Sequence, residues 1–518
     1  MDGSGSGKSA SYSIPNAHQC LGSYVFTDPK GELYDTTAGY LKEQGYDIKV
    51  LNLVRPQYSD GYNPLMHIAS ELDVDVIANT IVKGQKTDSG SDPYWDDMAE
   101  MLLKALIYYL IATRPEEEQN LASCAELVRA ANKNGGSNLL SDLMSQLPYD
   151  HPARMYYKSI EIAPEKTYGS ILSSLQSKLG KFDSKEIAEL TSTDTINFEE
   201  IGSKKTAVYV ISSDTHTAYD FLLTIFFSQM IQQLYDYADQ NGGRLKERTY
   251  FILDEFANIG KIPDFDKKIS TSRSRGISFS VILQNIDQLE AVYEKSYETI
   301  MGNCDTHVFL GSNSFKTVEY FSKQLGEKTI DRDNISINKD KQNHRTGKSL
   351  SDQIMARALM TPDELRRLDN DLCIIFEKGL KPVKAKKFYY FKHPMDKEMQ
   401  RYAISHNDIG EIDRGTWRKY NPYNPYVEED EEEKIENLNI ESLDDLFEDE
   451  DKKESVPVIK NDTSVNKEDT ETLDSLLNPN VDADAPLLPQ DEDEDTYDLQ
   501  KELEAKFDEL FGPLDDDV

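Results

Sequence analysis

Cysteine is scarce in this chain of 518 residues, and long hydrophobic runs are lacking. The four cysteines, Cys20, Cys124, Cys304 and Cys373, form no Cys-x-x-Cys pair, and the histidines form no cluster at the spacing of metal ligands. Both absences argue against a disulfide framework and against a structural zinc site. The longest apolar runs, "LLKALIYYLIA" and "FLLTIFF", fall short of the ~20 residues that a membrane-spanning helix needs. The sequence as given therefore predicts a soluble intracellular protein.

Basic residues are in the minority, because 57 lysines and arginines face 94 acidic residues and the formal net charge is −37. The excess is concentrated in residues 421–518, which carry 35 acidic and 7 basic side chains and leave a net charge of −9 on residues 1–420. A nearly balanced body can still present a local basic channel, so charge neither supports nor excludes a nucleic-acid partner. The composition of residues 421–518, acidic with few aromatics, predicts a disordered tail.

Apolar, β-branched or aromatic runs alternate with stretches of helical length along most of the chain. The runs are "SYVFTD", "DIKVLNL", "TAVYVIS", "YFILDE", "SFSVILQ", "THVFLG" and "LCIIFEKG". Strands that are buried on both faces and separated by helices are typical of a doubly wound parallel sheet, so the predicted fold class is α/β. Residues 69–194 show helical periodicity with few convincing strands. We therefore expect an inserted all-helical domain at 69–194, and a sheet domain built from residues 1–68 and 195–420.

A glycine-rich stretch at the start of the chain, "MDGSGSGKSAS", resembles a phosphate-binding loop. The pattern G-x-x-x-x-G-K-[ST] lets backbone N–H groups surround phosphate oxygens, while Lys contacts the β/γ-phosphates and Ser or Thr binds Mg²⁺. The first glycine of the pattern is replaced by Asp2, and a flexible linker is the alternative interpretation of these residues. The predicted nucleotide-binding residues are Gly3, Ser4, Gly5, Ser6, Gly7, Lys8 and Ser9.

A second motif, "YFILDEFANIG", places Asp254 and Glu255 directly after an apolar run. In a phosphate-loop protein, such an Asp orients Mg²⁺ and an adjacent Glu polarises the attacking water. A helix start capped by Asp is the alternative when the motif stands alone. The next predicted strand ends at Gln284, where a polar side chain can sense the γ-phosphate at the carboxyl edge of the sheet. Together with Lys8 and Ser9, these residues predict an ATP and Mg²⁺ site.

Two arginines, Arg273 and Arg275, lie between these two predicted strands in "STSRSRGIS". They are either solvated surface residues or include an arginine finger that reaches the nucleotide of a neighbouring subunit, which would require a ring. Asp28, in "TDPKGE", follows another predicted strand. Because Asp28 as an N-cap with Pro29 at the first helical position explains this motif equally well, we leave it out of the catalytic set.

An ordered series of motifs between residues 3 and 395 resembles the type IV coupling proteins. The motifs are "GSGSGKS", "SYVFTDPKGELYDTTAGYL", "PYWDDMAEMLLKALIYYL", "FILDEFANIGKIPDF", "VILQNIDQLEAVY", "NCDTHVFLG" and "RALMTPDELRRLDND". The resemblance implies a hexameric ATPase of the RecA/FtsK-like type that delivers relaxase-bound single-stranded DNA to a type IV secretion channel. By position it implies that Arg273, rather than Arg275, is the finger.

Members of that family carry membrane helices and a first sheet strand before the loop, and act at the cytoplasmic face of the bacterial membrane. This sequence has neither feature, so we expect an N-terminally truncated product. A soluble DNA-pumping ATPase of the chromosome-partitioning kind and a non-hydrolysing adaptor remain alternatives.

A short pattern occurs three times in the acidic tail. Each copy has an apolar residue, Asp, any residue, Leu and a second large apolar residue, and the copies begin at Leu443, Leu473 and Phe507. This spacing gives a small apolar face if the segment becomes helical on a partner. The copies are candidate docking sites for a relaxase or its accessory proteins, and plain solvation is the alternative.

Overall fold

The computed structural model describes residues 7–84, 93–132, 138–213, 219–339, 346–423 and 425. All of them belong to one compact unit, Met1–Glu428. The predicted disordered tail and its three repeated segments lie outside the described residues, as do Gly3, Ser4, Gly5 and Ser6. Within the described part of the chain, no helix is long and apolar enough to cross a membrane.

A five-stranded parallel sheet forms the centre of the unit, in the order β2-β3-β1-β4-β5. The strands are β1 (Ser23–Thr27), β2 (Asp47–Asn52), β3 (Thr206–Ile211), β4 (Thr249–Leu253) and β5 (Ile277–Val281). All five coincide with predicted runs, and β1 and β3 are buried along their whole length. Full burial explains why these runs are continuously apolar, since both faces of the sheet are covered.

Helices cover both faces of this sheet, and the alternation of side chains along each strand decides which helix each residue meets. Tyr24 and Phe26 of β1 pack in a cluster with residues of α1 (Ile14–Ala17) and α2 (Glu32–Glu43). Val25, between them, belongs to the opposite cluster, which includes α11 (Asp220–Gln240). This arrangement confirms the predicted doubly wound α/β class.

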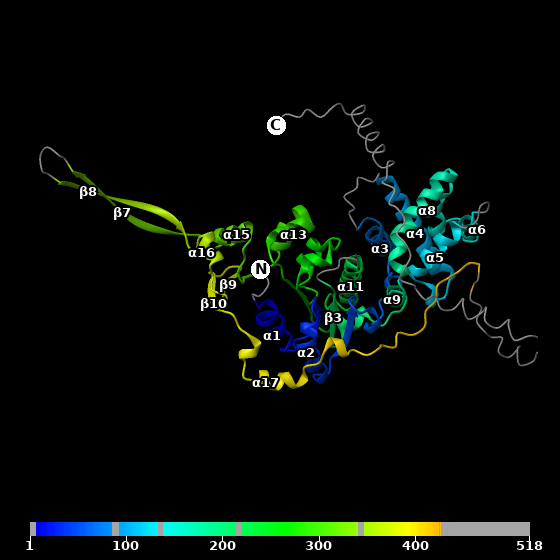
Figure 1. Cartoon of the computed structure of the whole chain (residues 1–518), viewed down its shortest axis with the longest axis horizontal. Helices are drawn as coiled ribbons and strands as arrows, with labels where there is room; N and C mark the ends of the chain where they lie inside the picture. The colour runs from blue at the N-terminus through cyan, green and yellow to red at the C-terminus, as the bar shows by residue number, and fades with distance from the viewer. Residues whose placement is uncertain are drawn as a thin grey trace, which may run out of the picture. The chain divides into compact units, whose positions relative to one another are not determined.

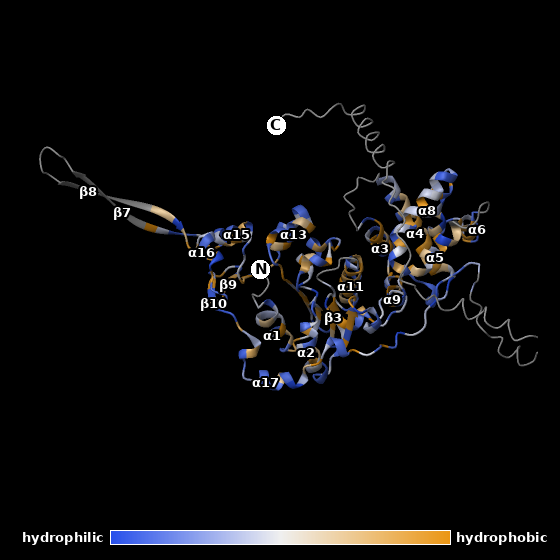
Figure 2. Cartoon of the chain, viewed as in Figure 1, coloured by the Kyte–Doolittle hydropathy of each residue, from blue (hydrophilic) through white to orange (hydrophobic). Residues whose placement is uncertain are grey.

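The described residues between β2 and β3 contain helices and no strand. The α-helices are α3 (Glu71–Lys83), α4 (Pro93–Thr113), α5 (Leu121–Asn132), α6 (Leu139–Ser145), α7 (Pro152–Glu161), α8 (Glu165–Leu179), α9 (Lys185–Leu190) and α10 (Phe198–Ser203). Figure 2 shows hydrophobic residues concentrated within α3, α4, α5 and α11. Buried side chains of these helices join those of the sheet and of α11 in one continuous cluster. The predicted domain boundaries stay a prediction.

The remaining elements follow β4 along the chain, and all of them except α12 also follow β5 (Figure 1). The α-helices are α12 (Phe265–Thr271), α13 (Ile286–Tyr293), α14 (Tyr297–Gly302), α15 (Phe315–Leu325), α16 (Pro362–Arg366) and α17 (Asp396–Met399). The strands are β6 (Thr306–Phe309), β7 (Glu327–Lys339), β8 (Thr346–Ala358), β9 (Leu372–Glu377) and β10 (Val383–Lys386). Strands β7 and β8 pair with each other as an antiparallel ribbon.

Two predicted strands are not part of the parallel sheet, and that part of the prediction was wrong. The runs "THVFLG" and "LCIIFEKG" form β6 and β9, which pair antiparallel with each other in a separate sheet of order β10-β9-β6. Strand β9 turns directly into β10 through Gly379, whose φ of +84° suits a tight reversal. A run of apolar residues indicates a buried strand but does not specify its direction or its partner.

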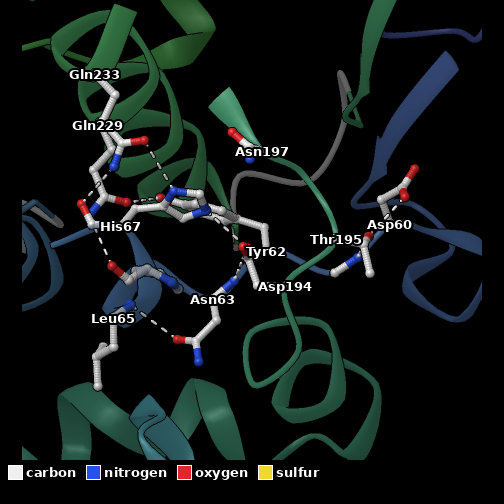
Figure 3. Close-up of polar contacts among 12 residues, drawn as sticks. Asp60, Tyr62, Asn63, Leu65, His67, Asp194, Thr195, Asn197, Gln229 and Gln233 are labelled. Atoms are coloured by element: carbon white, nitrogen blue, oxygen red, sulfur yellow. Dashed lines mark hydrogen bonds and ion pairs between the residues drawn. The ribbon is translucent and has the colours of Figure 1, made fainter. Parts of the chain in front are cut away.

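A buried polar network links α11 to two other segments, the one between β2 and α3 and the one between α9 and α10 (Figure 3). His67, in the segment before α3, contacts Asp194, in the segment after α9, with His67 Nε2 2.9 Å from Asp194 Oδ1. The backbone N–H of Asn63 donates to the same oxygen at 3.3 Å. From α11, the Gln229 side chain donates to the carbonyl of Pro64 at 2.9 Å. These contacts fix the position at which the chain leaves and re-enters the sheet region.

We expect the Asp194→Ala substitution to lower the free energy of unfolding by about 2 kcal/mol, because it leaves the buried His67 ring nitrogen without its acceptor. Equilibrium unfolding in urea measures this loss. Asp150→Ala, in an exposed turn before α7, is the matched control and should change stability by less than about 0.5 kcal/mol. Equal stability of the two variants would show that the His67–Asp194 contact contributes nothing.

Candidate functional site

The described part of the glycine-rich loop leads directly into a helix. Gly7 adopts a φ of +75°, a conformation that glycine tolerates and other residues rarely adopt. Its carbonyl accepts from both the backbone N–H and the hydroxyl of Ser11, at 2.8 and 2.7 Å. Lys8 and Ser9 follow at the start of a π-helical turn, Ser9–Ser13, that continues into α1. Hydrogen bonds from Ser11 to the Gly7 carbonyl therefore hold the loop next to Lys8.

Residues from distant parts of the chain meet at the carboxyl edge of the parallel sheet. Lys8 Nζ lies 3.0 Å from Glu255 Oε1 and 3.7 Å from Asp254 Oδ1. Ser9 Oγ donates to Asp254 Oδ2 at 3.5 Å, and Gln284 Nε2 donates to Glu255 Oε1 at 2.9 Å. Asp254 and Glu255 follow β4, and Gln284 follows the adjacent β5. Ligands of open α/β sheets gather at this edge.

The backbone at Glu255 is unusual, because its φ of +50° lies in the left-handed region. Such a conformation costs a non-glycine residue about 1 kcal/mol or more, and it is found preferentially at functional sites. The turn is held by Thr27, whose hydroxyl donates to the Asp254 carbonyl at 2.7 Å, and by the Phe256 N–H, which donates to Ile282 at 3.1 Å. The strained backbone directs the Glu255 carboxylate toward Lys8 and Gln284.

Burial raises the pKa of the Asp254 carboxyl, and the nearby Lys8 ammonium offsets part of that effect. A carboxylate in this position is stabilised by a cation. Ser9 Oγ and Asp254 Oδ2 are two oxygen atoms of the kind that Mg²⁺ prefers. No group of three acidic, histidine or cysteine side chains among the described residues could hold a metal ion. Because Mg²⁺ is usually held by one or two carboxylates together with phosphate oxygens and waters, this sparse set fits a nucleotide-bound Mg²⁺.

Asp28 lies next to this edge of the sheet. The sequence also suggested Asp28 as the N-cap of the following helix, but it does not occupy that position. Helix α2 begins at Glu32 with Gly31 as its N-cap, so the prediction of Pro29 at the first helical position was wrong. The Asp28 carboxylate nevertheless accepts from the backbone N–H of Tyr34 in the first turn, at 2.8 Å. Its burial raises the pKa of the carboxyl to about 6. These contacts give Asp28 a structural role.

Arg273 and Arg275 have different environments. Arg275 donates to both carboxylate oxygens of Asp239 at 3.0 Å and lies over the Tyr235 ring, 4.7 Å from its centre. The Arg273 side chain is 92% exposed, with a contact of 3.8 Å to Asp305. Both precede β5, so they lie at the amino edge of the sheet, opposite Glu255 and Gln284. Arg273 is therefore not part of the cluster that its own chain forms around Lys8.

Some residues around the loop were not found by sequence reasoning. The Tyr12 hydroxyl lies 2.8 Å from Ser280 Oγ and joins the loop helix to β5. Tyr389 packs on the loop itself, because a methyl group added to Gly7 would lie 2.9 Å from Tyr389 Cε1. Thr27 was detectable, since it ends a predicted strand, whereas no local pattern marks Tyr389.

A cavity of about 770 Å³ lies elsewhere, beside the His67 network. Its lining includes His67, Asp194, Glu199 and Asp236, and none of the site residues predicted from the sequence. We place the candidate site at Lys8 rather than at this cavity, because the chemistry-bearing residues converge at Lys8.

Comparison with known protein families and proteins gives a consistent result. Residues 1–410 match the model of a family described as type IV secretory system conjugative DNA transfer. The conjugal transfer protein TraG of Escherichia coli is 25% identical over 427 residues, covering 75% of this chain and 66% of that protein. The protein VirD4 of Rhizobium radiobacter is 25% identical over 406 residues, covering 74% of this chain and 55% of that protein. The chain thus spans 66% of the length of this TraG and 55% of the length of this VirD4.

Solved structures of similar fold include the bacterial conjugative coupling protein TrwBdeltaN70 in an unbound form. It is 18% identical with a TM-score of 0.54, and the match covers 75% of this chain and 83% of that chain. TrwB in complex with the ATP analogue ADPNP is 17% identical with a TM-score of 0.54, covering 75% and 84%. At these identities the likeness shows a shared fold.

Proposed function

We propose, from the premise that this chain belongs to the type IV secretory system conjugative DNA transfer family, that it is an ATP-driven coupling protein. It recruits relaxase-bound single-stranded DNA and passes it to a type IV secretion channel at the cytoplasmic face of the bacterial membrane. The observation that carries the proposal is the meeting of Lys8, Ser9, Asp254, Glu255 and Gln284 at one edge of the sheet.

Each of these residues has a role that its contacts support. Gly7 and Lys8 bind the phosphates of ATP, together with Gly3, Ser4, Gly5 and Ser6, which lie outside the described residues. Ser9 and Asp254 would hold Mg²⁺. A bound Mg²⁺ would supply positive charge that offsets the negative charge of the phosphates.

Glu255 accepts a proton from the attacking water, and Gln284 orients the Glu255 carboxylate through the 2.9 Å hydrogen bond. The phosphates of ATP compete with Glu255 for Lys8, because the Lys8 ammonium group lies 3.0 Å from the Glu255 carboxylate. ATP binding therefore releases Glu255 for the attacking water.

A ring assembly is part of the proposal, and the position of Arg273 supports it. Its side chain is 92% exposed at the amino edge of β5, whereas the ATP site lies at the carboxyl edge. A strand of five residues separates the two edges by about 16 Å, which exceeds the reach of an arginine side chain. Arg273 therefore serves the nucleotide of a neighbouring subunit, as a hexameric ring provides.

Substrate recruitment is assigned to the acidic tail. The segments that begin at Leu443, Leu473 and Phe507 dock the relaxase or its accessory proteins, and three tethered copies raise the effective concentration of the substrate. The family description, type IV secretory system conjugative DNA transfer, supports a DNA substrate and a secretion channel as partners.

The decisive test of the proposal is nucleotide binding by the Lys8→Ala variant. We expect its affinity for ATP to fall roughly 100-fold, because a charge-assisted contact to phosphate is lost. The substitution also leaves Asp254 and Glu255 as uncompensated negative charges beside the phosphates. Calorimetric titration of the full chain with Mg²⁺-ATP measures the affinity, and ATP turnover is followed with and without single-stranded DNA.

Lys166→Ala, on the exposed side of α8, is the matched control and should bind like the parent. Unchanged ATP affinity of Lys8→Ala would contradict the phosphate-binding role. A parent chain that binds ATP without turning it over, with DNA present, would favour the non-hydrolysing adaptor instead.

A further inference from the structure

The segment that follows β10 returns across the phosphate loop. A methyl group added to Gly7 would lie 2.9 Å from Tyr389 Cε1, so the Tyr389 ring packs directly on the loop backbone. Farther along, the segment passes over α2, where the backbone N–H of Ile404 donates to the Asp35 carbonyl at 3.0 Å. In Figure 1 this is the yellow stretch that runs from β10 past α1 and through α17. The chain therefore carries aromatic residues to the place where the phosphates bind.

Consecutive aromatic side chains in this segment have different surroundings. Tyr390 packs against the cluster that contains α1 and α2. Tyr389 and Phe391 stack on each other, with ring centres 5.2 Å apart and planes inclined by 23°. Phe391 is 51% exposed, and Tyr389 is half-buried. Tyr389 therefore contacts the loop at Gly7, and Phe391, stacked on it, reaches solvent.

The segment that carries the stacked pair is anchored before the pair, at Tyr389 and farther along the chain. Lys387, just before it, donates from its side chain to the Leu310 carbonyl at 2.9 Å, and from its backbone to Asp371 at 2.8 Å. The Tyr389 hydroxyl donates to the Asn370 carbonyl at 3.3 Å. At the far end, His406 Nδ1 lies 2.9 Å from the Asp35 carboxylate. A flat ligand that stacks on these rings would lose little affinity to ordering of the protein.

We propose that Tyr389 and Phe391 form the platform on which the base of the bound nucleotide stacks. The inference rests on the proposed ATP site, because the phosphates at Gly7 and Lys8 determine where the base can reach. A nucleobase is flat and aromatic, and it gains affinity by stacking on aromatic side chains whichever base it is. Lys392 lies over the Tyr389 ring, 4.6 Å from its centre, and this flexible side chain is displaced when the base arrives.

Recognition by stacking alone predicts which nucleotides bind more tightly. The purine nucleotides ATP and GTP have larger π-surfaces than the pyrimidine nucleotide CTP, so both should bind more tightly than CTP. Inorganic tripolyphosphate carries the same phosphates without a base. It therefore reports on Gly7 and Lys8 without contacting Tyr389 or Phe391.

The experiment compares ATP and tripolyphosphate on the full chain by calorimetric titration in the presence of Mg²⁺. We expect Tyr389→Ala to raise the Kd for ATP about tenfold, through loss of the stacking surface, and to leave the Kd for tripolyphosphate unchanged. Phe391→Ala should act in the same direction, and Tyr389→Phe should retain parent affinity. Tyr149→Ala, which removes an aromatic ring that is 73% exposed before α7, is the matched control and should bind both ligands like the parent.

The other outcomes overturn the platform. Equal ATP affinity of Tyr389→Ala and the parent shows that the base lies elsewhere, and a change of oligomeric state alone assigns these rings to a contact between copies. Equal losses for ATP and tripolyphosphate show that Tyr389 only supports the loop. A parent chain that binds neither ligand removes the proposed ATP site as well, whereas a parent that binds both leaves that site intact when the platform fails.

Discussion

The Glu255→Gln variant should bind ATP at least as tightly as the parent and turn it over at least about 100-fold more slowly. The glutamine keeps the size of the side chain and its hydrogen-bonding oxygen, but it cannot accept a proton from water. It also removes the negative charge that lies 3.0 Å from Lys8 Nζ. Lys8 then meets the phosphates without first breaking an ion pair, so turnover and affinity should change in opposite directions.

Steady-state phosphate release and calorimetric ATP titration of the same preparation separate these two effects. Glu165→Gln, at the exposed start of α8, is the matched control and should leave both quantities unchanged. Parent-like turnover in Glu255→Gln would exclude Glu255 as the general base. Weaker ATP binding would show that the Glu255 charge supports the site instead of competing for Lys8.

Arg273→Ala should lower ATP turnover about 1,000-fold while leaving ATP binding and folding intact. The side chain is 92% exposed and lies at the edge of the sheet away from Lys8, so its removal does not alter the ATP site of its own chain. Arg275→Ala is the matched control, two residues away. It breaks the contacts with Asp239 and Tyr235, so it should lower stability without a comparable loss of turnover.

Mixing two inactive variants tests whether Arg273 acts on a neighbour. In a mixed ring, an interface is complete where an Arg273→Ala subunit supplies Glu255 and a Glu255→Gln subunit supplies Arg273. With equal amounts and independent sites, about one quarter of the interfaces are complete, so turnover should recover to about that fraction of the parent rate. Absence of recovery at every mixing ratio would identify Arg273 as a surface residue.

The sequence alone predicted the parallel sheet and most of the residues that meet in the candidate site, because both depend on local signals. A strand that is buried on both faces must be apolar along its length, as in "TAVYVI" of β3. Polar residues placed directly after such runs, as at Asp254 and Gln284, must gather at the carboxyl edge. Their contacts with Lys8, 3.0 Å for Glu255 and 3.7 Å for Asp254, agree with that reasoning, and their chemical roles stay proposals.

Only the tertiary structure decided features that depend on which segments meet. An apolar run does not state its direction, so β6 and β9 were assigned to the parallel sheet although they form an antiparallel one. The αL conformation of Glu255 results from contacts of Thr27 and Ile282 around the turn. Tyr389 reaches Gly7 from more than 380 residues away, because β9, β10 and the segment behind them turn back toward the loop. No local pattern encodes that meeting, since it arises from the packing of the whole unit.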